Sequence, residues 1–298
     1  MKIANAPCSW GVLEFGLEGK TADYQTVLRE MSDTGYMGTE LGDWGFMPTD
    51  PAILKDILSK YNLDLIGAFV PVNFINAVAH ESGAKTAIKI ASLLSAINPE
   101  EAKIVLSDEN GKNSTRRKMA GRIEPRHSLN ISNWSTFAEG VNFVAKRVFE
   151  ETGVESVFHH HCAGYVETPN EIDKLLDRTN SDLVGLCFDT GHYAFGGGDP
   201  IQGLKKYSER IKHVHFKDWS QSIAAESAKN EWDYFESVKN GIFCELGKGS
   251  IDFEKILEEL KSQEYDGWIV VEQDILPGMG SPKESAQRNR EFLRSIGI

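Results

Sequence analysis

Four short segments of the sequence place histidine, aspartate and glutamate residues where apolar runs end. These segments are His159-His160-His161, Asp189-Thr190-Gly191-His192, His213-Val214-His215-Phe216-Lys217-Asp218 and Val271-Glu272-Gln273-Asp274. Imidazole nitrogens and carboxylate oxygens together suit Mn²⁺, Co²⁺, Fe²⁺ or Zn²⁺, and no thiolate ligand is expected, which excludes a soft metal. The residue types therefore indicate a site for one divalent metal ion.

The surrounding chain alternates short apolar runs with longer amphipathic stretches, a pattern typical of βα units and a parallel sheet. The eight predicted strands are Ile3–Ser9, Gly38–Leu41, Leu63–Pro71, Lys103–Ser107, Glu155–His161, Leu183–Thr190, Ile211–Lys217 and Gly267–Gln273. Eight repeats in 298 residues, with no linker rich in Pro, Ser or Gly, predict an α/β fold. We expect one closed (β/α)₈ TIM barrel, a single domain over residues 1–298.

An open Rossmann-type sheet is the alternative, but no G-x-G-x-x-G follows the first predicted strand, and Gly196-Gly197-Gly198 is interpreted as a turn. Helix starts are predicted at Asp50-Pro51, Thr168 to Glu171, Asp199-Pro200, Ser250 to Glu254 and Ser281-Pro282. The longest connection, residues 218–249, has the length of a lid or a binding loop.

The carboxyl ends of parallel barrel strands meet at one mouth, where active sites are found. Alternate residues of a strand share a face, so His159 and His161 are expected to point together, as are His213 and His215. Taken singly, each segment has another interpretation: core histidine pairs, a helix cap at Asp189, or a lysine partner for Glu272. Their joint position at four consecutive strand ends favours one shared site.

The composition and charge of the chain indicate which classes of binding partner are expected. The net charge of −12 argues against nucleic acid as a ligand, and the one basic cluster, Arg116-Arg117-Lys118, is interpreted as a solvated loop. The four cysteines contain no C-x-x-C pair, and neither a signal peptide nor a membrane-spanning run is recognised. We therefore expect a cytoplasmic protein that acts on a small molecule, with no membrane partner.

The four segments resemble the xylose isomerase-like TIM-barrel superfamily of sugar isomerases, epimerases and related metal-dependent enzymes. That resemblance implies one metal ligand on each of strands five to eight, matched here by Asp189, His215 and Glu272. His159 stands where the family usually has glutamate. Further segments are similar to the inosose (2-keto-myo-inositol) dehydratase family: Asn5-Ala6-Pro7-Cys8-Ser9-Trp10-Gly11, Gly35 to Gly42 and the triple histidine.

This resemblance implies a lyase that eliminates water from a cyclic polyol ketone in inositol catabolism. The implied metal is Mn²⁺ or Co²⁺, with Zn²⁺ or Fe²⁺ as alternatives, bound by His159, Asp189, His215 and Glu272. Homo-oligomers are common among relatives of this kind. The alternatives are a sugar epimerase or isomerase that uses the same metal site, a non-catalytic sugar-binding protein, and a DNA-repair endonuclease, which the acidic charge disfavours.

Individual roles follow from the same resemblance. Glu272 is the candidate base, and the candidate acids are His192, His161 and Lys217, with a histidine preferred because its ordinary pKa of about 6.5 suits proton transfer. Candidate substrate contacts come from strands one and two. They are Asn5, Trp10, which is equally interpretable as a core aromatic, and Glu40, which is alternatively a helix-capping or surface residue.

Overall fold

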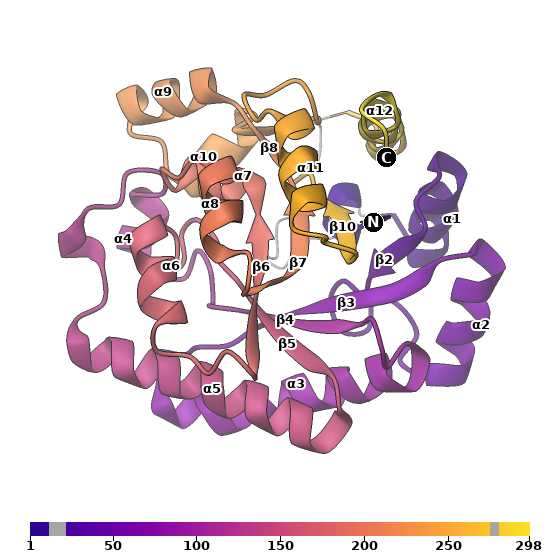
Figure 1. Ribbon diagram of the computed structural model, residues 1–298, viewed down its shortest axis with the longest axis horizontal. Coiled ribbons are helices and arrows are strands. Elements are labelled where there is room, and N and C mark those ends of the chain that lie inside the picture. The colour runs from indigo at the N-terminus through magenta and orange to yellow at the C-terminus, as the bar shows by residue number, and fades with distance from the viewer. Residues whose placement is uncertain (12–21, 275–279) are drawn as a thin grey trace.

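The computed structural model describes residues 1–11, 22–274 and 280–298 and shows eight parallel strands closed into a barrel (Figure 1). Around the barrel the strands follow the order β1-β10-β7-β6-β5-β4-β3-β2. Their bounds are β1 Lys2–Asn5, β2 Gly38–Glu40, β3 Asp64–Pro71, β4 Lys103–Ser107, β5 Glu155–His159, β6 Val184–Asp189, β7 Ile211–Phe216 and β10 Trp268–Val271. The predicted TIM barrel and all eight predicted strands are confirmed.

Helices follow the strands and cover the outside of the barrel, with long α3 and α5 packed against each other (Figure 1). The α-helices are α1 Tyr24–Thr34, α2 Pro51–Tyr61, α3 Ala77–Ile97, α4 Ser114–Lys118, α5 Ile131–Thr152, α6 Pro169–Leu176, α7 Thr190–Phe195, α8 Pro200–Tyr207, α9 Gln221–Asn230, α10 Tyr234–Lys239, α11 Phe253–Ser262 and α12 Pro282–Ser295. Short 3₁₀ helices span Pro7–Trp10 and Pro125–His127. None of the helices in the described ranges is long and apolar enough to cross a membrane.

Capping residues begin these helices where the sequence indicated. Asp50 accepts the N–H groups of Ala52 and Ile53, and Thr168 forms a reciprocal capping box with Glu171. The predicted start between Ser250 and Glu254 is confirmed: α11 begins at Phe253 and is capped by Asp252. The Ser250 hydroxyl instead accepts the Gln221 N–H, in another part of the fold.

Most of the strands are shorter than predicted, and two of these differences affect candidate site residues. β1 ends at Asn5, because the proline that follows has no N–H for a sheet ladder and instead opens the 3₁₀ helix Pro7–Trp10. β5 ends at His159, so His160 and His161 lie on the loop beyond the strand. The histidine run is therefore spread over a strand end and a turn.

The long connection 218–249 is folded. It contains α9, α10 and a two-stranded antiparallel sheet of β8 Asp218–Trp219 and β9 Phe243–Cys244. Its apolar residues Tyr234, Val238, Ile242 and Phe243 form a buried cluster separate from the main core. Asp218 closes its base, because its carboxylate accepts the N–H groups of Gly247, Gly249 and Ile251.

Candidate metal centre

The carboxyl ends of four adjacent strands bring four potential ligands to one point inside the barrel mouth. His159 ends β5, Asp189 ends β6, His215 lies in β7 and Glu272 follows β10. One nitrogen or oxygen atom from each residue lies within 4.8 Å of those of the others. His159, Asp189 and His215 are buried, whereas the Glu272 side chain is 12% exposed. Glu272 is therefore the member that solvent and a small ligand can reach.

The spacing of these atoms fits a single metal ion. Asp189 Oδ2 lies 3.7 Å from His159 Nε2 and 4.0 Å from His215 Nδ1, which in turn lies 3.3 Å from Glu272 Oε2. Ligands at about 2.1 Å from a tetrahedral centre are roughly 3.4 Å apart. Among the described residues, buried Asp189 Oδ2 and His215 Nδ1 have no hydrogen-bond partner. Since buried polar atoms are rarely left unpaired, a bound cation fits the arrangement.

Electrostatics set the protonation of the group. Burial, assisted by the charge of His215, lowers the pKa of His159 to about 3, so its ring is neutral. Burial opposes ionisation of Glu272, but the charges of His215 and Lys217 hold its pKa well below the usual range. Burial also opposes protonation of His215, yet Cys187, Glu272 and Glu40 raise its pKa well above normal. A metal ion bound here must therefore displace a proton from His215.

The three candidate acids lie beside the four ligands. Lys217 Nζ is 3.2 Å from Glu272 Oε2, 3.2 Å from Asp274 Oδ2 and 3.3 Å from His192 Nε2. The rings of His192 and His161 are 3.9 Å apart between centroids. Burial and neighbouring positive charge lower the pKa of His161 to about 3 and that of His192 well below normal. Lys217 remains protonated, because Asp274 and Glu272 outweigh its burial.

The three candidate substrate residues are all buried. Asn5 is fully buried and its Oδ1 accepts the Ala6 N–H. Trp10 belongs to the hydrophobic core and donates its indole N–H to Glu30 at 2.8 Å, which agrees with the core alternative. Glu40 is neither a helix cap nor a surface residue, the two alternatives for it: its side chain is buried between two histidines of β7.

One sulfur atom lies near the four proposed ligands, as a thiol rather than a thiolate. Cys187 Sγ lies within 4.8 Å of ligand nitrogens of His159 and His215. Cys187 precedes Asp189 by two residues on β6, so the period-two pattern of a strand was the signal that placed it on the same face. Burial raises its pKa to about 12, which makes it a neutral thiol beneath the ligands.

Two aromatic residues of the 218–249 connection pack against the candidate acids beside the proposed metal ligands. The Tyr234 hydroxyl lies 3.5 Å from His161 Nε2, and the Phe243 ring lies 4.9 Å from Lys217 Nζ. Phe243 also packs edge-on against His192, with centroids 4.7 Å apart. No sequence periodicity links Tyr234 and Phe243 to the barrel strands, because they pack in a small cluster with the loop residues Cys162 and Ala163.

The basic cluster is not a solvated loop. Arg116 lies in α4, is 1% exposed, and donates two hydrogen bonds of 2.8 Å to the Glu171 carboxylate. Its Nε donates to the Gly164 carbonyl, in the loop that follows β5. Glu167, also buried, accepts the Ala163 N–H in that loop. Arg116 therefore fixes the segment that carries His161 and Cys162.

Comparison with known proteins places the chain among relatives. Residues 28–296 match the xylose isomerase-like TIM barrel family. The inosose dehydratase of Clostridium perfringens is 31% identical over 294 residues, 99% of this chain and 97% of that protein. The inosose dehydratase of Lacticaseibacillus casei is 33% identical over 293 residues, 98% of this chain and 96% of that protein.

Among solved structures, the IolI protein with a bound zinc atom shares the fold, with a TM-score of 0.71 at 16% identity over 99% of this chain and 98% of that one. The chain therefore belongs to the xylose isomerase-like TIM barrel family, together with the inosose dehydratases.

Proposed function

We propose that this protein is a metal-dependent hydro-lyase that removes water from 2-keto-myo-inositol, a cyclic polyol ketone. The observation that carries the proposal is the convergence of His159, Asp189, His215 and Glu272, in which two buried ligand atoms lack a hydrogen-bond partner among the described residues. The names of relatives that align over nearly the whole chain support the choice of reaction and substrate.

The proposed ligands are His159 Nε2, Asp189 Oδ2, His215 Nδ1 and Glu272 Oε2, the atoms that face one another. Two nitrogens and two oxygens suit Mn²⁺ or Co²⁺, with Zn²⁺ and Fe²⁺ as the other candidates. A divalent ion at this point would polarise the ketone oxygen and stabilise the enolate that forms when the α-proton leaves.

Glu272 accepts the α-proton. It is the partly exposed member of the group, and its carboxylate is ionised. The electron pair of the broken C–H bond forms the enolate, and its return expels the β-hydroxyl as the carbon–carbon double bond forms. A general base of this kind contributes typically 10²–10⁴-fold to a rate.

Lys217 donates the proton with which the β-hydroxyl leaves as water. Its ammonium lies 3.2 Å from Glu272 Oε2, so the proton taken by Glu272 can return to Lys217 after product departs. This geometry favours Lys217 over the histidines preferred from sequence, and the neutral rings of His161 and His192 support the same choice. His192 Nε2, at 3.3 Å from Lys217 Nζ, orients the ammonium.

An epimerase would need a base on each face of the substrate. Glu272 supplies one, but on β5 the corresponding position holds His159, whose neutral ring faces Asp189 rather than the exposed side. This favours elimination over proton return at the opposite face.

The test uses full-length protein stripped with chelator and supplied with 2-keto-myo-inositol. We expect the absorbance of the unsaturated or dione product to appear only after Mn²⁺ or Co²⁺ is added, and to be lost in Glu272→Gln. Glu101→Gln, at the opposite end of the barrel, is the matched control and should retain activity. Metal binding without turnover would overturn the dehydratase assignment, and absence of metal binding would overturn the site.

A further inference from the structure

The side chain of Glu40 lies inside the barrel between two histidines that the sequence separates by one residue. Its Oε1 lies 2.9 Å from His213 Nε2 and 3.1 Å from His215 Nε2. Gly67 of neighbouring β3 leaves room for this carboxylate, because a Cβ there would lie 3.1 Å from Oε1. One carboxylate oxygen thus lies within hydrogen-bonding distance of two imidazole rings on the same face of β7.

Glu40 Oε1 lies within hydrogen-bonding distance of the Nε2 atoms of both rings, and a carboxylate oxygen accepts hydrogen bonds. Both histidines must therefore present an Nε2–H toward it. For His215, this leaves Nδ1 directed at Asp189 and Glu272, where it has no hydrogen-bond partner among the described residues.

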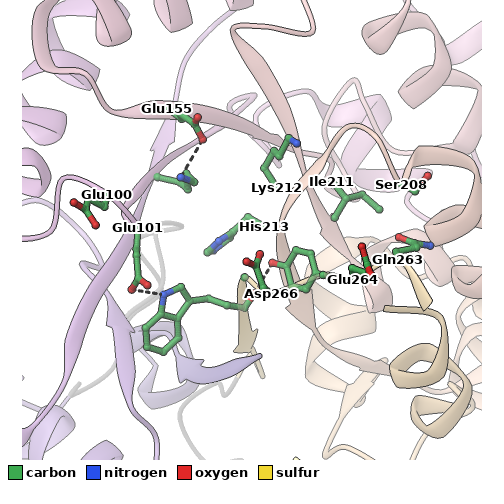
Figure 2. Close-up of a pocket in the computed structure, with 14 residues that line it drawn as sticks. Glu100, Glu101, Glu155, Ser208, Ile211, Lys212, His213, Gln263, Glu264 and Asp266 are labelled. Atoms are coloured by element: carbon green, nitrogen blue, oxygen red, sulfur yellow. Dashed lines mark hydrogen bonds and ion pairs between the residues drawn. The ribbon is translucent and has the colours of Figure 1, made fainter. Parts of the chain in front are cut away.

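The second histidine connects the carboxylate to the opposite end of the barrel. His213 lines a cavity of about 470 Å³ at the amino ends of β4, β5, β7 and β10, in which Lys103 pairs with Glu155 (Figure 2). Figure 2 shows His213 among the residues that line this cavity. His213 therefore contacts the Glu40 carboxylate from the amino end of the barrel. It does not belong to the ligand group that contains Asp189.

We infer that Glu40 is a positioning residue of the metal centre: it fixes the His215 ring so that Nδ1, not Nε2, is the nitrogen offered to the metal ion. Carboxylates in this position orient a ligating histidine and raise its basicity, and their loss typically costs about 10- to 100-fold in metal affinity. The inference rests on the proposed metal centre and is independent of which substrate is turned over.

Zinc affinity of the full-length, metal-stripped protein tests it by competition with a chromophoric chelator. We expect Glu40→Ala to weaken Zn²⁺ binding about 10- to 100-fold. Glu40→Gln keeps the shape and an acceptor oxygen but loses the charge, so it should weaken binding less and fold normally if the alanine variant does not. Glu101→Gln is the matched control: it removes a carboxylate at the opposite end of the barrel and should leave zinc affinity unchanged.

Imidazole nitrogen-15 NMR of the wild type supplies a readout that a merely structural role would not move. We expect His215 to keep its proton on Nε2 with and without Zn²⁺, and its Nδ1 resonance to shift on zinc addition. Coordination through Nε2 would overturn the inference. So would a second zinc ion per chain that His213→Gln removes, because it would place an ion among Glu40, His213 and His215.

The outcomes separate this inference from the proposed function. If the wild type binds zinc and both Glu40 variants bind it equally well, the positioning role is wrong while the metal centre stands. If the wild type binds no zinc, the metal centre fails and the inference fails with it. Loss of dehydratase activity alone, with the affinity order preserved, leaves the positioning role supported.

Discussion

The two oxygens of Asp189 serve different ends: Oδ1 accepts the His192 N–H at 2.7 Å, whereas Oδ2 is directed at His159 Nε2, 3.7 Å away. The first contact caps α7, and the second faces the proposed metal position. The helix-cap interpretation of Asp189 and the ligand interpretation are therefore compatible, because each uses one oxygen.

Asp189→Asn separates these two uses. Its side-chain oxygen can still accept the His192 N–H, so we expect the metal-stripped variant to unfold near the wild-type temperature. Loss of the anionic ligand should reduce metal affinity by more than about 100-fold, the upper cost of losing an outer partner. Asp189→Ala should in addition lose about 1 kcal/mol of stability with the cap. Unchanged metal affinity in the asparagine variant, measured by chelator competition, would contradict the ligand role.

Lys217→Met should affect the reaction and the metal differently. Removal of the ammonium eliminates the proposed proton donor, so kcat should fall about 10²–10⁴-fold. Metal affinity should not fall, because a positive charge 3.2 Å from Glu272 is removed. Lys212→Met, an exposed lysine on the same strand, is the control. Parallel loss of activity and metal affinity would show instead that Lys217 supports the ligand geometry.

Arg116→Met should destabilise the fold strongly. The substitution leaves the carboxylates of Glu171 and Glu167 buried without their cation, and breaking a buried pair costs about 3–5 kcal/mol. Arg147→Met, which breaks the surface ion pairs with Glu151 and Glu81, should change stability far less. Urea unfolding measures both, and similar losses in the two variants would refute the structural role of Arg116.

Glu167 predicts a pH dependence of stability. Burial raises its pKa to about 7 despite nearby Arg116. The folded state therefore favours the protonated acid, and its contribution to stability is lost as pH rises from the unfolded value of about 4.3 through about 7. Glu167→Gln removes this loss, so its free energy of unfolding relative to wild type should rise with pH across that window.

The slope of this difference, at most about 1.4 kcal/mol per pH unit, is the measured quantity. Urea unfolding of both proteins in the presence of chelator at several pH values provides it. A difference that stays constant between pH 5 and 7 would show that Glu167 is already ionised in the folded protein.

Much of the architecture could be predicted because the alternation of short apolar runs and amphipathic stretches is typical of a (β/α)₈ barrel. Apolar runs located the strands, and the rule that parallel strands converge at their carboxyl ends predicted that His159, Asp189, His215 and Glu272 lie together. Asp50 and Thr168 marked helix starts because a cap acts within three residues along the chain.

Contacts that depend on register and distant partners were beyond the sequence. Pairing between β2 and β3 shifts register between Thr39 and Glu40, so the orientation of Glu40 could not be obtained by counting residues. Arg116 looked solvated because its partner Glu171 lies 55 positions away. Tyr234 reaches His161 only through the packing of a separate cluster.

The closure of the 218–249 connection by Asp218 has a consequence for how the substrate specificity of such an enzyme can evolve. Three backbone N–H groups at its far end donate hydrogen bonds to this one carboxylate, so both ends of the connection meet at a fixed point on the barrel. Its tip can change length or composition without altering the strand that carries His215. The connection is therefore a segment whose sequence can vary between related enzymes. Its substrate-facing residues can change while the metal ligands on the barrel strands stay the same.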